Sequence, residues 1–99
     1  MGATWMIETN SSAEFEALRS ENAPEAHMTY TSCMHVMRAA GIEVDGETYV
    51  FVIPAEAVAE AAERLREAAW TDARVGWRGE EVAEVCDAAA RLGRGVVAA

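Results

Sequence analysis

The sequence has no lysine, and its eight basic residues are all arginines set against 17 aspartates and glutamates, which gives a net charge of −9. A chain this acidic is a poor ligand for a phosphate backbone, because that affinity comes from neutralising phosphates with lysine and arginine. Direct binding to nucleic acid is therefore not expected. The 99 residues suit one domain of ordinary size, so we expect a single acidic domain over residues 1–99.

Long apolar runs are also missing. No stretch approaches the roughly 20 apolar residues that span a bilayer, and the N-terminal residues lack the positive charge and apolar run of a secretion signal. The two cysteines, Cys33 and Cys86, lie among apolar helical positions rather than in a disulfide or metal-binding pattern. These absences predict a cytoplasmic protein that does not associate with membranes.

Catalytic and metal-binding patterns are absent as well. On a helix, Cys33 and His35 would point about 200° apart, so they could not act together. His27 and His35 would be separated by about 12 Å along a helix axis, too far to share a zinc ion. We therefore expect no enzyme activity, no cofactor and no metal, with both cysteines in the core and both histidines at the surface.

The N-terminal half predicts a strand and two helices. Residues 4–9 hold a short apolar run that suits a strand, and Ser11 with Glu14 forms a capping box at a helix start. Apolar residues then recur at helical spacing over about 25–40 after Pro24, and Gly41 is a natural helix stop.

The second half begins with the strongest turn signal in the chain. Asp45-Gly46 predicts a tight hairpin that joins strands over 42–44 and 48–53. In that register Ile42, Val44, Tyr49, Phe51 and Ile53 share one face. Because Val50 and Val52 make the other face apolar too, the second strand is predicted to be central. A helix is predicted over 54–69, followed by a strand over 74–78 with Trp77 inward. A second helix is predicted over 80–92, beginning after Gly79 and burying Leu92. The tail at 96–99 is predicted to form an edge strand or to fray.

Counting the first two helices as one crossover, this order is βαββαβ followed by a C-terminal helix. It predicts an α+β domain of the split-βαβ, ferredoxin-like kind, with helices on one face of the sheet. This architecture hosts many unrelated functions, so function must be argued from surface residues.

The clearest remaining signal is the arrangement of the acidic residues. Four glutamates recur along one helix and would form a ribbon about 16 Å long, which we call the acidic ribbon: Glu56, Glu60, Glu63 and Glu67. A second cluster surrounds the predicted hairpin turn: Glu43, Asp45 and Glu47. Both sets also suit a plain solvated surface. The functional interpretation is that these carboxylates imitate the charge row of a nucleic-acid backbone and bind a basic surface of a partner protein.

We therefore expect a non-enzymatic protein-binding inhibitor or regulator that blocks the nucleic-acid-binding surface of its partner through these acidic patches. Small acidic inhibitors, anti-CRISPR proteins and other DNA mimics among them, act in this way. The comparison is one of functional type, and no motif ties the chain to a family.

The alternative is a homodimeric ferredoxin-like module for self-association or small-ligand binding. Val50 and Val52, with part of the 5–7 run, would supply its apolar surface. Trp70 falls at a predicted helix end. Its indole there either packs against the helix or stays exposed, where it could contact a partner protein.

Overall fold

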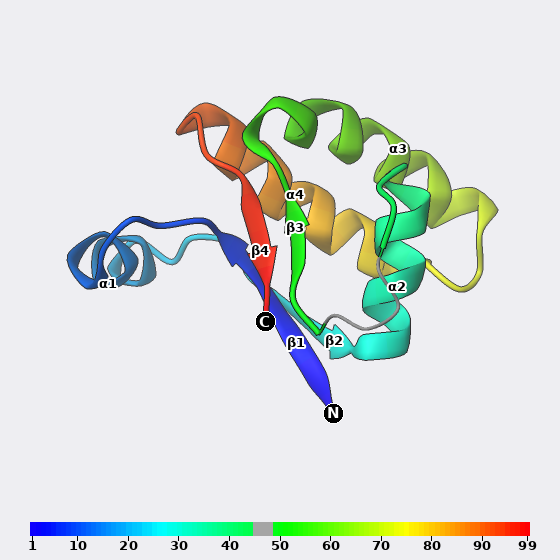
Figure 1. Cartoon of the computed structure of the whole chain (residues 1–99). Coiled ribbons are helices and arrows are strands. Elements are labelled where there is room, and N and C mark those ends of the chain that lie inside the picture. Colours follow the sequence, from blue (N-terminus) through cyan, green and yellow to red (C-terminus); the bar gives the residue numbers. More distant parts are fainter. Residues whose placement is uncertain (45–48) are drawn as a thin grey trace.

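A computed structural model describes residues 1–44 and 49–99 of the chain and shows strands alternating with helices along most of the sequence (Figure 1). The elements are β1 (Gly2–Ile7), α1 (Ser12–Ser20), β2 (Ala26–Thr29), α2 (Tyr30–Ala39), β3 (Phe51–Ile53), the 3-10 turn η1 (Ala55–Ala57), α3 (Val58–Thr71), α4 (Trp77–Arg91) and β4 (Val96–Ala98).

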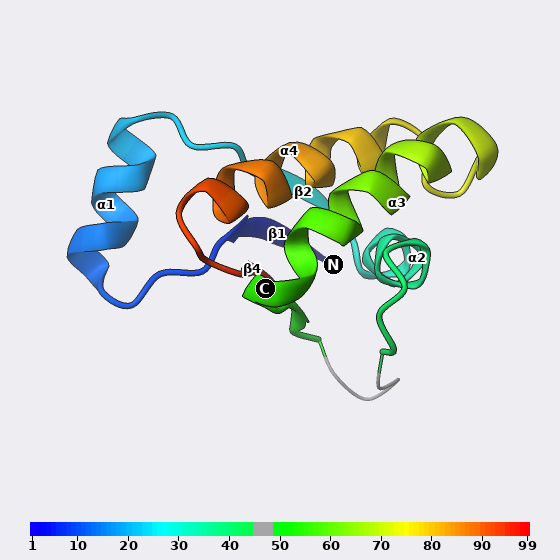
Figure 2. The same ribbon diagram turned by 90° about the horizontal axis from the view of Figure 1, so that it is seen from above.

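The four described strands form one sheet in the order β2-β1-β4-β3, and every neighbouring pair in it is antiparallel. The predicted α+β class is thus confirmed. The ferredoxin-like arrangement is not confirmed, because the observed elements do not follow the expected βαββαβ order. Figure 2 shows α3 and α4 side by side over one face of the sheet, with α1 beyond the end of the strands.

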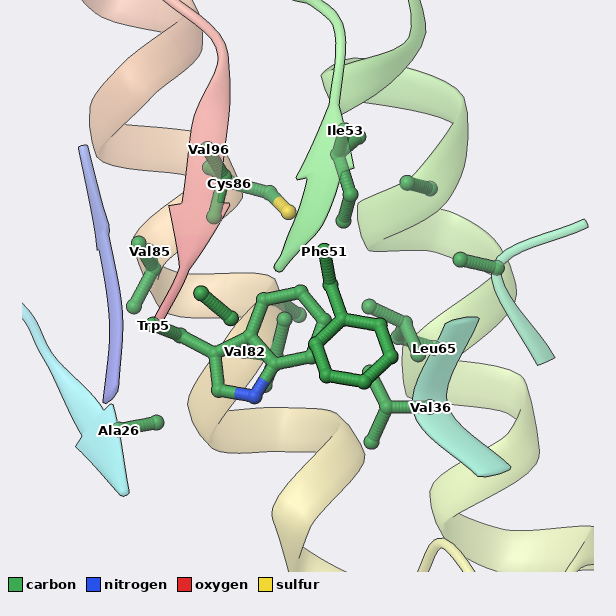
Figure 3. Packing of buried hydrophobic residues seen from close by; sticks show 14 of the residues in the cluster. Trp5, Ala26, Val36, Phe51, Ile53, Leu65, Val82, Val85, Cys86 and Val96 are labelled. Atoms are coloured by element: carbon green, nitrogen blue, oxygen red, sulfur yellow. The ribbon is translucent and has the colours of Figure 1, made fainter. Parts of the chain in front are cut away.

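The core lies between the sheet and these helices, because residues along each strand alternate between the two faces. Strand residues that point toward the helices are buried: Ala3, Trp5, Ile7, Ala26, Met28, Phe51, Ile53, Val96 and Ala98. Trp5 and Phe51 stack at the centre of this cluster, with ring centroids 6.2 Å apart, and Val82 and Leu65 lie next to them (Figure 3). Stacked aromatic rings at this separation add to the free energy of burial alone.

The predicted helix over 25–40 is wrong in its first turn. Ala26–Thr29 instead form β2, which pairs with β1 and alternates buried and exposed side chains. The helix begins at Tyr30 because the Thr29 hydroxyl accepts a hydrogen bond from the Ser32 N–H at 3.2 Å. Its end is as predicted, since Gly41 has the left-handed φ of 81°.

The predicted strand over 74–78 is also wrong. The Asp72 carboxylate accepts a hydrogen bond from the Arg74 N–H at 2.9 Å, which makes a turn, and Gly76 with φ 53° leads into α4. The short alternation of apolar residues there predicts a strand, but the turn at Asp72 and the start of α4 override it. Val75 is buried, but Trp77, predicted to point inward, lies in the first turn of α4 with 61% of its surface exposed.

The hairpin region differs as well. Residues 42–44 form no strand, and residues 45–48, which include the predicted turn, lie outside the described residues. The later strand is shorter than predicted and lies at a sheet edge as β3, where it pairs with β4. The tail, expected to form an edge strand or to fray, is instead the interior strand β4, and Leu92 is exposed rather than buried.

Candidate protein-binding surface

The acidic ribbon lies on the outward side of η1 and α3. The inward residues of α3 are apolar and buried (Val58, Ala61, Ala62 and Leu65), and the helical period therefore turns the glutamates to solvent. All four predicted ribbon residues, Glu56, Glu60, Glu63 and Glu67, are exposed. Glu60 also accepts a hydrogen bond from Arg64 Nη2 at 2.9 Å, which offsets part of its charge. The structure therefore brings the ribbon together on one surface.

The second predicted cluster is described only in part. Glu43 is exposed at the end of the segment that follows α2, whereas Asp45 and Glu47 lie outside the described residues. The role of this cluster in partner binding therefore stays a prediction.

One arginine holds α3 against α4 from the solvent side. Arg66 Nη2 donates to Asp87 Oδ2 at 2.7 Å, and its Nε donates to Glu80 Oε1 at 3.2 Å. The pKa of Arg66 is raised above its ordinary value, and the hydrogen bond to Asp87 is the largest cause. The charges of Glu80 and Asp87 are thus partly compensated. Glu63 and Glu67 of α3 take part in none of the ion pairs found among the described residues, and the same holds for Glu81 and Glu84 of α4.

Two tryptophans are exposed near the turn between α3 and α4. Trp70 is 91% exposed, which contradicts packing against its own helix end, and Arg78 lies over the ring of Trp77 at 4.8 Å from the centroid. Trp70 follows Glu67 by three residues, so it continues the helical stripe of the acidic ribbon. That spacing was the available sequence signal that Trp70 shares a face with the glutamates.

The outward face of the sheet is a second candidate surface. Its central row is apolar: Met6 of β1 lies opposite Val97 of β4, which in turn lies opposite Val52 of β3. The sequence predicts Val52 and part of the 5–7 run on this face, but not Val97, because no pattern in the tail indicates an interior strand. Val52 keeps 44% of its surface exposed.

A groove of about 380 Å³ adjoins this row. It opens between β1 and α1, and its lining includes Met6, Phe15, Leu18, Arg19 and Pro24. The Arg19 guanidinium lies 5.6 Å from the centroid of the Phe15 ring. The groove joins the apolar side of α1 to the apolar row of the sheet.

The cysteines and histidines do not form a chemical site in the described part of the chain. Both thiols are buried as predicted, and burial raises the pKa of Cys33 and raises that of Cys86 to about 12. His27 is exposed on β2, where its Nδ1 lies 2.9 Å from Thr4 Oγ1. Among residues 1–44 and 49–99, no three histidine, cysteine or acidic residues gather as they would around a metal ion.

The chain matches no protein family, and neither a curated protein nor a solved structure matches it in sequence or fold. No helix among the described residues is both long and apolar enough to cross a membrane. Function therefore has to be argued from the two candidate surfaces.

Proposed function

We propose that the protein is a non-enzymatic inhibitor or regulator that binds a basic, nucleic-acid-binding surface of a partner protein through the outward face of α3. The observation that carries the proposal is the stripe formed by the acidic ribbon and Trp70. Exposed carboxylates recur along it, and it ends on an indole that is 91% exposed.

The two parts of this stripe support binding in different ways. Carboxylates in a row attract a basic surface and raise the association rate, typically by about 10–10³. An exposed tryptophan supplies apolar area at low conformational cost, and tryptophan is enriched among the residues that dominate binding energy. A partner that binds nucleic acid through a basic groove beside an apolar pocket would fit both.

Charge reversal on α3 tests the proposal. Glu63→Lys with Glu67→Lys changes the net charge by four units and leaves the Glu60–Arg64 pair in place. Glu16→Lys with Glu21→Lys makes the same change at exposed positions on and after α1. The tagged wild-type chain is used to capture partners from its native cytosol, the captured protein is identified by mass spectrometry, and affinities are then measured with the purified pair.

We expect the captured protein to bind DNA or RNA, and nucleic acid to compete with the chain for it. The α3 double variant should weaken binding about tenfold or more, while the α1 control should change it much less. Equal affinity of the wild type and the α3 variant, or equal losses in both variants, would show that the acidic ribbon does not form the contact.

A further inference from the structure

The groove between α1 and β1 lies where α1 extends beyond the end of the strands (Figure 2). Its volume of about 380 Å³ falls at the small end of the range typical of ligand pockets, about 300–1,000 Å³. Met6 of β1 lines one side, and Phe15 and Leu18 of α1 line the other. All three side chains are half-buried. The groove therefore has the size and the apolar lining for a ligand about as large as one amino acid.

Two opposite charges line the same groove. Arg19 belongs to α1, whereas Glu25 directly precedes β2. The antiparallel register of β1 and β2 places Glu25 next to Met6, on the sheet side of the groove. The guanidinium and the carboxylate thus come from opposite sides.

Neither of these charges is used within the fold. Arg19 and Glu25 are both exposed, and neither takes part in an ion pair found among residues 1–44 and 49–99. The Arg19 guanidinium lies 5.6 Å from the centroid of the Phe15 ring, a cation–π contact that favours its position at the groove. Because the two groups do not neutralise each other, each can bind a ligand group of the opposite charge.

The arrangement of charged and apolar groups indicates the class of ligand. A ligand carboxylate would bind the Arg19 guanidinium through charge-assisted hydrogen bonds, and a ligand ammonium would bind the Glu25 carboxylate. An apolar side chain between them would pack against Met6, Phe15 and Leu18. A ligand that carries both charges has no net charge, so the field of a chain of net charge −9 does not repel it, whereas that field repels a simple apolar acid.

From this arrangement we infer that the groove between α1 and β1 binds a free α-amino acid with a large apolar side chain. Arg19 holds the α-carboxylate, Glu25 holds the α-ammonium, and the apolar lining takes the side chain. A residue inside a peptide has lost both charges to peptide bonds, so a free amino acid fits this groove better than a peptide segment does. The inference does not depend on the function proposed for α3, because it concerns a different surface.

Isothermal titration calorimetry of the whole chain with L-phenylalanine and with L-leucine tests the inference, and chemical-shift changes in NMR spectra locate the site. We expect saturable binding of one ligand per chain, with the largest shifts around Met6, Leu18 and Glu25. N-acetyl-L-phenylalanine lacks the ammonium and L-phenylalaninamide lacks the carboxylate, so each should bind about tenfold more weakly or worse. Glycine, which lacks the apolar side chain, should also bind more weakly.

Two substitutions assign each charge of the ligand to one residue. Arg19→Gln should weaken binding of L-phenylalanine about tenfold and remove its advantage over the amide, while its advantage over the N-acetyl derivative remains. Glu25→Gln should have the converse effect. Arg38→Gln on α2 and Glu84→Gln on α4 remove the same charges at exposed positions outside the groove, and they should change neither the affinity nor these preferences. Circular dichroism verifies that each variant is folded.

Three results would overturn the inference. The first is a wild type that binds neither L-phenylalanine nor L-leucine at millimolar concentrations. The second is equal affinity for L-phenylalanine, its amide and its N-acetyl derivative, because the groove would then take any apolar group. The third is a pair of folded variants, Arg19→Gln and Glu25→Gln, that keep the affinity and the preferences of the wild type, since the ligand would then bind elsewhere.

Discussion

The guanidinium Nη2 of Arg94 lies 2.6 Å from Oε2 of Glu14, and this ion pair joins the turn before β4 to the first turn of α1 across 80 residues of sequence. The other carboxylate oxygen of Glu14 accepts a hydrogen bond from the Asn10 N–H at 3.2 Å. Glu14 thus holds the start of α1 both locally and across the fold. Leu18 packs against the core, but α1 has no fully buried side chain, so these polar contacts help to fix its position.

Arg94→Ala is therefore expected to loosen α1 rather than the whole domain. Both partners remain about a third exposed, so solvent screening limits the loss to about 1 kcal/mol or less. Amides of α1 should exchange faster, while those of α4 keep their protection, and the wild type at high salt should behave like the variant. Arg91→Ala, an exposed arginine at the end of α4, is the control. Equal exchange of α1 in Arg94→Ala and the wild type would contradict the anchoring role.

Gly79 marks a close approach of α4 to α3. A Cβ at this position would lie 2.6 Å from the Leu65 carbonyl oxygen and 2.7 Å from Val75 Cγ1. In an exposed helix, glycine to alanine gains about 1 kcal/mol of stability. Here Gly79→Ala should instead lower the free energy of unfolding by about 1–3 kcal/mol, because the two helices must move apart.

Urea denaturation of Gly79→Ala and the wild type measures this difference. Ala90→Gly, at an exposed position of the same helix, should lose about 1 kcal/mol through helix propensity alone. If Gly79→Ala proved more stable than the wild type, propensity would outweigh contact at this position, and the close approach of the helices would not hold.

The sequence predicted features whose causes are local. The Ser11 cap is present, with its hydroxyl accepting a hydrogen bond from the Glu14 N–H at 3.1 Å, and Gly41 ends α2 with a left-handed φ. The buried positions of α3 and the burial of both cysteines also follow from helical periodicity. For the same reason, the exposure of the acidic ribbon could be predicted residue by residue.

What the sequence could not predict depends on pairing between distant segments. Ala26–Thr29 form a strand because they pair with β1. The short tail becomes β4 because it pairs with β1 on one side and with β3 on the other. Nothing within three or four residues encodes those partners. The apolar row of Met6, Val97 and Val52 could be predicted only in part for this reason, since the place of Val97 depends on the register of β4.

Trp70 is expected to contribute to binding and not to stability. Its side chain is almost fully exposed, so Trp70→Phe should change the free energy of unfolding by less than about 0.5 kcal/mol. Acrylamide quenching of fluorescence should fall in Trp70→Phe but not vanish, because Trp77 stays 61% exposed, whereas Trp5 is fully buried and inaccessible to the quencher. Trp5→Phe is the contrasting variant and should lose stability through the cavity it leaves. A loss of more than about 1 kcal/mol in Trp70→Phe would show that this indole packs against the domain.

Cys86 makes stability depend on alkaline pH. Burial, with the neighbouring Asp87 charge, raises the pKa of the Cys86 thiol to about 12, whereas a cysteine in an unfolded chain titrates near 8.5. Between these values the unfolded chain releases a proton that the folded chain retains, so the free energy of unfolding falls as pH rises. The contribution is complete below the unfolded pKa and is lost on approach to the folded one.

Urea denaturation at a series of pH values above neutrality measures this dependence, with Cys86→Ala as the matched variant. The wild type should lose up to about 1.4 kcal/mol per pH unit more than Cys86→Ala, since one proton is released on unfolding. Cys86→Ala is also expected to be less stable at neutral pH, because it removes buried volume, but that offset does not change the slope. Parallel pH profiles for the two proteins would mean that the thiol ionises in the folded chain as readily as in the unfolded one, and that solvent reaches Cys86.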